Sequence, residues 1–186
     1  MSRFNDKFER ASDTPLSWHN SSTDLRSAAA AVWWAMSAGQ RETIAAKCGL
    51  GEGFDLRVAG RPGYEMLCGM SLELLYKAIA VAKRKKILTH HRLVELSEYV
   101  GIESDAREKG LLGILTQAIK WSGRYPIPKE RRDWDQTAHL RTEHLYTKVP
   151  LGSFSVLRPN GELDWLSFNE LWLKADQVYW EHHYDS

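Results

Sequence analysis

The chain has 186 residues, of which 26% are charged, and a formal net charge of +1. This length suits one domain that buries a sizeable core, and the near-neutral balance excludes a global field that would draw the protein to nucleic acid or to a membrane. The N-terminus lacks a signal-peptide pattern and the longest apolar run, SAAAAVWWAM, is about half a membrane span, so we expect a soluble, cytoplasmic protein.

The first predicted elements follow a polar start. Residues 1–20 carry Ser, Asn, Thr and Pro15 without periodicity, which predicts an arm or loop. We expect residues 21–186 to form a single domain. From Thr23 apolar residues recur at three- and four-residue spacing, which predicts a long helix, and a short helix follows at about 41–48.

The middle of the chain predicts three further helices. The first covers about residues 62–85 and has proline in its first turn, where the missing N–H is no loss. Thr89 is the expected N-cap of the second, which Gly101 ends. Ser104 or Asp105 is expected to cap the third.

Helix-breaking residues divide the last third of the chain. SGRYPIP, residues 122–128, ends the preceding helix, because each proline disfavours the α conformation in the residue before it. Apolar spacing then predicts a helix over 131–146, and GSFSVLRPNGELDWL predicts a small hairpin around its Pro-Asn-Gly turn. Ser167 and Glu170 form an expected capping box for the last helix. Together these patterns predict an all-α domain with a β-hairpin before its last helix.

Residues 64–128 contain three notable motifs: SLELLYKAI within a long helix, the segment THHRLVEL, and a helix that ends in WSGRYPIP. With these motifs the segment resembles the HEPN superfamily of helical-bundle proteins. This resemblance implies an up-and-down bundle of four or five long helices, frequently dimeric. Many members are metal-independent ribonucleases of toxin–antitoxin, phage-defence or RNA-processing systems, and others have lost catalysis and serve as binding or dimerisation modules.

Active members of that superfamily carry an arginine, usually followed by a polar residue, then four to six further residues and a histidine. A histidine can take the proton from a ribose 2′-OH or return one to the leaving oxygen, and a forked arginine can hold the phosphate as charge builds on its oxygens. Arg132 with His139 fits this spacing, as does Arg84 with His90 or His91.

Sequence context favours Arg132 and His139 as the catalytic pair. Polar Asp133 follows the arginine, as in many members of the superfamily. On one helix the two residues lie about 10 Å apart along the axis and on the same side, pointing away from the apolar positions. A solvated polar face gives the same pattern. About 45 residues follow the pair, whereas the motif normally opens a C-terminal helix, so the charged helix is alternatively an insertion.

Neighbouring residues are expected to hold the RNA. Arg124 and Tyr125 offer a phosphate contact and a stacking surface, and Lys129 adds a positive charge; the structural alternative is that SGRYPIP only stops a helix. Cys48 and Cys68 suggest neither a disulfide framework nor a metal knuckle, so we expect no metal and no cofactor.

The predicted function is therefore a HEPN-like ribonuclease, a toxin or phage-defence effector that acts on RNA and has an antitoxin or defence-system partner protein. We expect a homodimer, because one Arg–His pair gives little surface for RNA and the eight tryptophans exceed the needs of a core. The alternatives are a non-catalytic HEPN-like module that dimerises and binds a partner protein or nucleotide, and an unrelated helical scaffold.

Overall fold

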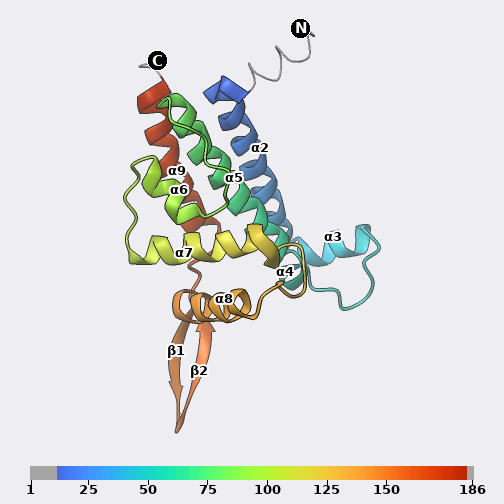
Figure 1. Cartoon of the computed structure of the whole chain (residues 1–186). Coiled ribbons are helices and arrows are strands. Elements are labelled where there is room, and N and C mark those ends of the chain that lie inside the picture. Colours follow the sequence, from blue (N-terminus) through green and yellow to red (C-terminus); the bar gives the residue numbers. More distant parts are fainter. Residues whose placement is uncertain (1–11, 184–186) are drawn as a thin grey trace.

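The computed structural model describes residues 12–183 and is mainly helical, with one antiparallel hairpin before the last helix (Figure 1). This confirms the predicted class. The elements are α2 (Pro15–Ala35), α3 (Arg41–Lys47), α4 (Leu56–Ala59), α5 (Arg61–Ala82), α6 (Leu93–Tyr99), α7 (Ala106–Gln117), the π-helix η1 (Ala118–Ser122), α8 (Arg131–His144), β1 (Tyr146–Leu151), β2 (Phe154–Pro159) and α9 (Trp165–His183).

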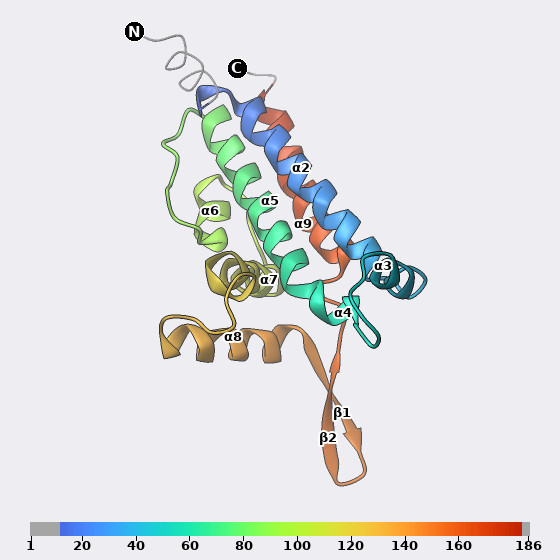
Figure 2. The same cartoon turned by 90° about the vertical axis from the view of Figure 1, so that its right-hand side faces the viewer.

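Three long helices, α2, α5 and α9, lie side by side in the described chain, and α2 runs opposite to the other two (Figures 1 and 2). The helices α7 and α8 instead run across one end of this group. The described helices are therefore not four or five long rods in up-and-down order. Because α8 crosses the end of the bundle, it lies at the edge of the molecule and one side of α8 faces outward.

The helix α5 is the centre of the core, because side chains around most of its circumference are buried. The largest fully buried side chains include Tyr64, Leu72, Leu75 and Ile79 of α5, Leu93 of α6, Leu111 and Leu112 of α7, and Phe168 and Tyr179 of α9. A helix that is apolar on most sides belongs in the middle of a bundle. Among the described residues, even so, no helix is long and apolar enough to cross a membrane.

The α7 helix begins and ends as predicted. The carboxylate of Asp105 accepts a hydrogen bond from the backbone N–H of Glu108, whose own carboxylate accepts one from the backbone of Asp105. The helix continues into the π-turn of η1 and stops at SGRYPIP. A Cβ built on Gly69 would lie 2.8 Å from Ile119 Cγ1, so a glycine allows α5 and η1 to cross closely.

The hairpin forms, but its turn differs from the predicted one. Leu151 pairs with Phe154 across a two-residue loop in which Gly152 has a φ of +61°. The Pro-Asn-Gly sequence instead lies at the end of β2, where the chain leaves the hairpin. There the side chain of Asn160 donates to the carbonyl oxygen of His144 at 2.9 Å and ties the root of the hairpin to the end of α8.

The first long helix begins at Pro15, so the prediction of an arm or loop over 1–20 is wrong for the end of that segment. Its polar residues gain a tertiary partner that periodicity does not reveal: buried His19 places Nε2 2.6 Å from the carboxylate of Asp176 on α9. The predicted arm at 1–11 lies outside the described residues.

Two other predicted caps are wrong. Thr89 does not cap α6, which begins at Leu93, and the Leu93 N–H donates instead to the hydroxyl of Thr116 on α7 at 3.1 Å. Ser167 lies inside the first turn of α9, where its hydroxyl accepts a hydrogen bond from Arg107. At α6 a hydrogen bond from another helix thus replaces the expected local cap, whereas at α9 the predicted cap residue binds a side chain of α7 instead.

Candidate functional site

The outer side of α8 carries the predicted catalytic pair. The side chains of Arg132 and His139 are 81% and 76% exposed, so both point outward as their spacing predicts. Arg132 Nε lies 2.7 Å from a carboxylate oxygen of Glu130, and His139 Nε2 lies 3.2 Å from one of Glu143. Each is thus engaged by a glutamate of its own segment, and no described contact joins the two. Their catalytic role stays a prediction.

The residues predicted to position RNA are only partly brought together. Arg124 Nη2 donates to the carbonyl oxygens of Ile119 and Lys120 at 2.9 and 3.0 Å, which satisfies the open end of η1, and its guanidinium lies 5.5 Å from the ring centre of Tyr125. The Lys129 side chain is exposed. In the described part of the chain none of these three residues contacts Arg132 or His139. Arg124 already has a structural role, because its guanidinium binds the carbonyl oxygens of η1.

The inner side of α8 holds a buried ion pair that our sequence analysis missed. Arg141 reaches Glu65 of α5 with two parallel hydrogen bonds, Nη1 to Oε2 at 2.7 Å and Nη2 to Oε1 at 2.9 Å. The Glu65 side chain is only 3% exposed. Burial lowers the pKa of Arg141, but the hydrogen bonds and negative charge of Glu65 outweigh it and raise the pKa above its ordinary value. One signal was present, since Arg141 falls among the apolar positions of its helix.

A second arginine extends this ion pair toward α9. Arg61 Nε donates to Glu65 at 3.0 Å, while its other nitrogens reach the carboxylate of Asp164 at 3.4 Å and the carbonyl oxygen of Leu163 at 3.2 Å. A buried carboxylate shared by two guanidiniums is costly to bring out of water, and removing one partner leaves an uncompensated charge. Glu65 therefore fixes α8, α5 and the start of α9 against one another.

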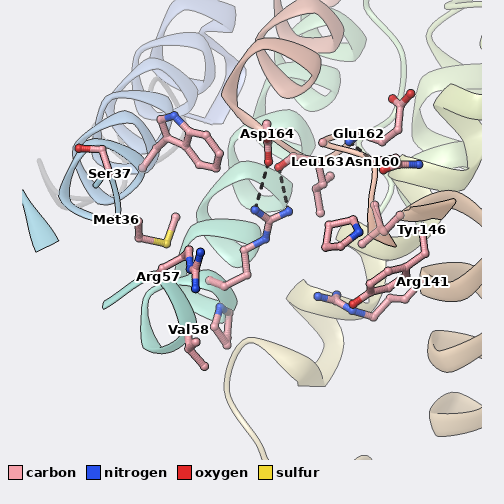
Figure 3. Close-up of a pocket in the computed structure, with 16 residues that line it drawn as sticks. Met36, Ser37, Arg57, Val58, Arg141, Tyr146, Asn160, Glu162, Leu163 and Asp164 are labelled. Atoms are coloured by element: carbon pink, nitrogen blue, oxygen red, sulfur yellow. Dashed lines mark hydrogen bonds and ion pairs between the residues drawn. The ribbon is translucent and has the colours of Figure 1, made fainter. Parts of the chain in front are cut away.

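A cavity of about 1020 Å³ opens beside this network, at the root of the hairpin (Figure 3). Its walls come from the end of α2, from α4 and α5, and from the root of the hairpin. Trp33, Met36 and Val58 supply apolar surface. The arginines on its wall already have carboxylate partners, because Arg57 lies 3.5 Å from Asp55 and the other two are paired as described. The cavity therefore suits an apolar group better than a free anion.

A smaller cavity of about 280 Å³ lies on the other side of Arg141. Trp121 and Trp134 form one wall with ring centres 6.0 Å apart, and Glu65 and Arg141 contribute its polar side. Trp134 is 45% exposed. Because Trp134 and the catalytic pair lie on different sides of α8, this cavity is separate from the predicted site.

Another buried charge cluster lies on α5. Lys77 Nζ is 2.6 Å from a carboxylate oxygen of Glu73, and His91 Nδ1 is 2.9 Å from the other oxygen. Both Glu73 and Lys77 are buried, although their i,i+4 spacing is typical of an exposed helix pair. Arg84, the alternative partner of His91 in sequence, ends the helix with a φ of +52° and makes no described contact with it.

A metal site and a reactive thiol each place requirements on the described residues. Over residues 12–183, no three His, Cys, Asp or Glu side chains are grouped so that they could hold a metal ion. Cys48 is exposed and Cys68 is buried, and both are free; burial raises the pKa of the Cys68 thiol.

Comparisons with known proteins do not assign the chain. No family model, no curated protein and no solved structure matches it.

Proposed function

We propose that this protein is a HEPN-like, metal-independent ribonuclease that cleaves RNA on the outer side of α8. The observation that carries the proposal is the exposure of Arg132 and His139 on one side of a helix whose other side is fixed by the buried Glu65–Arg141 pair. A rigid helix that presents both groups to solvent gives a phosphate group access to them. The family resemblance supplies the reaction class.

The reaction needs only groups that RNA and this pair provide. His139 removes the proton of a ribose 2′-OH, the 2′-oxygen attacks the adjacent phosphorus, and the bond to the 5′-oxygen breaks as protonated His139 returns that proton to the leaving oxygen. Arg132 holds the phosphate oxygens as their negative charge increases. The products are a 2′,3′-cyclic phosphate and a 5′-hydroxyl. No metal is required to generate a nucleophile, because the substrate already contains it.

The ion pairs of the resting protein do not obstruct this chemistry. Glu130 and Glu143, the partners of the two catalytic residues, have side chains that are 57% and 55% exposed. Exposed ion pairs contribute about 0–1 kcal/mol. A phosphate can therefore displace Glu130 from Arg132 at little cost.

The test is cleavage of a labelled, unstructured RNA in the presence of EDTA. We expect 2′,3′-cyclic phosphate ends, and a fall of about 10²–10⁴-fold in rate for His139→Ala. Thr142→Ala, an exposed substitution on the same helix, is the matched control and should keep the full rate. If the protein is a toxin or defence effector, toxicity on expression should be lost in His139→Ala and kept in Thr142→Ala. Strict dependence on magnesium, or equal rates for the two variants, would contradict the proposal.

The second candidate function is a non-catalytic HEPN-like module that binds a partner. The cavity of about 1020 Å³ favours it, because a concave surface with apolar walls and fixed polar groups is typical of a binding site. Under this alternative the wild-type protein shows no cleavage above that of His139→Ala.

A further inference from the structure

The hairpin projects away from the helices (Figure 2). Most of its residues are exposed, and several of them are apolar. Cross-strand partners share a face, so the pairs Leu151–Phe154 and Val149–Val156 place four large apolar side chains on one face. Leu151 is 65% exposed and Phe154 is 77% exposed, both at the tip. An isolated two-stranded hairpin is at best marginally stable in water. This face is therefore expected to pack against another surface.

A proline interrupts each edge of the hairpin, which disfavours the addition of another strand. Leu151 and Phe154 flank a two-residue loop and form a hydrogen-bonded pair, so alternate residues direct their backbone groups outward. Pro150 on β1 and Pro159 on β2 occupy such outward positions and have no N–H to donate. Prolines and charged residues at these positions protect an edge strand from pairing with another chain. What remains for binding is the apolar face and the tip.

The cavity at the hairpin root offers apolar walls against which such an exposed tip can pack. Trp33, Met36 and Val58 form apolar walls, and Val58 is 67% exposed. A hairpin cannot fill the cavity at its own root, because six residues of strand hold the tip about 20 Å away. An apolar tip that fills this cavity must therefore come from another molecule.

We propose that two copies of this chain associate by exchanging their hairpins, each tip seated in the cavity at the root of the other copy's hairpin. In this arrangement the two hairpins lie antiparallel about a two-fold axis, so every contact occurs twice. Phe154 and Leu151 of one copy meet Val58 and Trp33 of the other.

The areas involved favour this reciprocal arrangement over packing of the two faces alone. Large apolar side chains each offer about 150–200 Å², so the exposed fractions of Leu151, Phe154 and Val156 amount to roughly 300–400 Å² per copy. Stable interfaces bury about 1,200–2,000 Å² in total. Two tips seated in two cavities bring the total toward the lower bound, which two faces alone do not reach.

The first experiment is disulfide trapping. Val58→Cys and Phe154→Cys are combined in a Cys48→Ser background, and the protein is oxidised with oxidised glutathione. Because a disulfide requires Cα atoms about 4.4–6.8 Å apart, a covalent dimer on a non-reducing gel reports direct seating of tip in cavity. The matched control pairs Phe154→Cys with Leu166→Cys, at an exposed residue outside the cavity. Trapping no better than this control overturns the proposal.

The second experiment measures mass in solution. Light scattering of the wild-type protein should give about twice 21.3 kDa at high concentration. Phe154→Ser, which removes the tip, and Val58→Arg, which blocks the cavity, should each give monomers with an unchanged circular dichroism spectrum. Mixing these two variants leaves one intact tip and one intact cavity, half of the wild-type interface, so the mixture should associate more weakly than the wild type but more strongly than either variant alone. A monomeric wild type, or dimers that persist in Val58→Arg alone, would overturn hairpin exchange.

The two proposals fail independently. His139→Ala lies outside the exchanged surfaces and should form the same dimer as the wild type, whether or not the protein cleaves RNA.

Discussion

The two sides of α8 differ in what their charges do. On the inner side, Arg141 makes two hydrogen bonds to Glu65, whose side chain is 3% exposed. On the outer side, Arg132 and His139 are at least three-quarters exposed and meet only exposed glutamates. Removing an inner charge is costly in stability, because its partner stays buried without compensation. An outer charge has only an exposed partner, which a ligand can displace. Burial of the partner thus separates an arginine that holds two helices together from one whose charge a ligand can reach.

The largest expected effect is on the inner side. Glu65→Gln removes the charge that both Arg61 and Arg141 need, and we expect the free energy of unfolding to fall by about 3–5 kcal/mol. Denaturant unfolding followed by tryptophan fluorescence measures this. Glu170→Gln, at an exposed position of α9, is the control and should change stability by no more than about 0.5 kcal/mol. Equal stability of the two variants would show that the buried pair does not hold α8.

The close crossing of α5 and η1 beneath α8 gives the next effect. Gly69→Ala places a Cβ 2.8 Å from the Ile119 side chain and 2.9 Å from the Leu115 carbonyl oxygen, so we expect a loss of about 1–3 kcal/mol. Gly63→Ala, on the same helix with nothing within 4 Å, should instead stabilise by about 0.5–1 kcal/mol. Thermal melting measures both. Shifts of the same sign would contradict the crossing described here.

The smallest expected effect is on the outer side. Arg132→Ala removes an exposed side chain that is away from the buried network, so we expect stability to change by no more than about 0.5 kcal/mol. The same denaturant titration as for Glu65→Gln measures it. A loss of several kcal/mol would mean that Arg132 has a structural partner and that the two sides of α8 do not differ.

The sequence predicted the class of fold because its strongest signals are local. Spacing of apolar residues located the long helices, the capping box at Asp105 is present, and the prolines after Ser122 end η1 as expected. The start of α6 at Leu93 depends on a hydrogen bond to Thr116, a partner far along the chain that no local pattern contains. The start of α2 does have a local signal, Pro15 in the first turn, but the polar residues that follow it lack the apolar periodicity of a helix, and one of them, His19, has its partner at Asp176.

The same limit applies to the candidate site. Helical spacing predicted that Arg132 and His139 point outward, because exposure around one helix follows from its period. It could not reveal that Glu73 and Lys77 are buried, since an i,i+4 pair looks the same on a surface helix. The cavity at the hairpin root also escaped prediction, because its walls come from segments more than 100 residues apart.

Comparison of Arg132→Lys with Arg131→Lys in RNA cleavage is the sharpest test of catalysis on the outer side of α8. The two arginines are neighbours with side chains 81% and 86% exposed, so charge and exposure are matched and only the proposed role differs. Lysine keeps the charge but loses the forked geometry that holds a phosphate. We predict that Arg132→Lys lowers the cleavage rate by about 10²–10³-fold while Arg131→Lys retains it. Equal rates for the two variants would contradict a catalytic site on the outer side of α8.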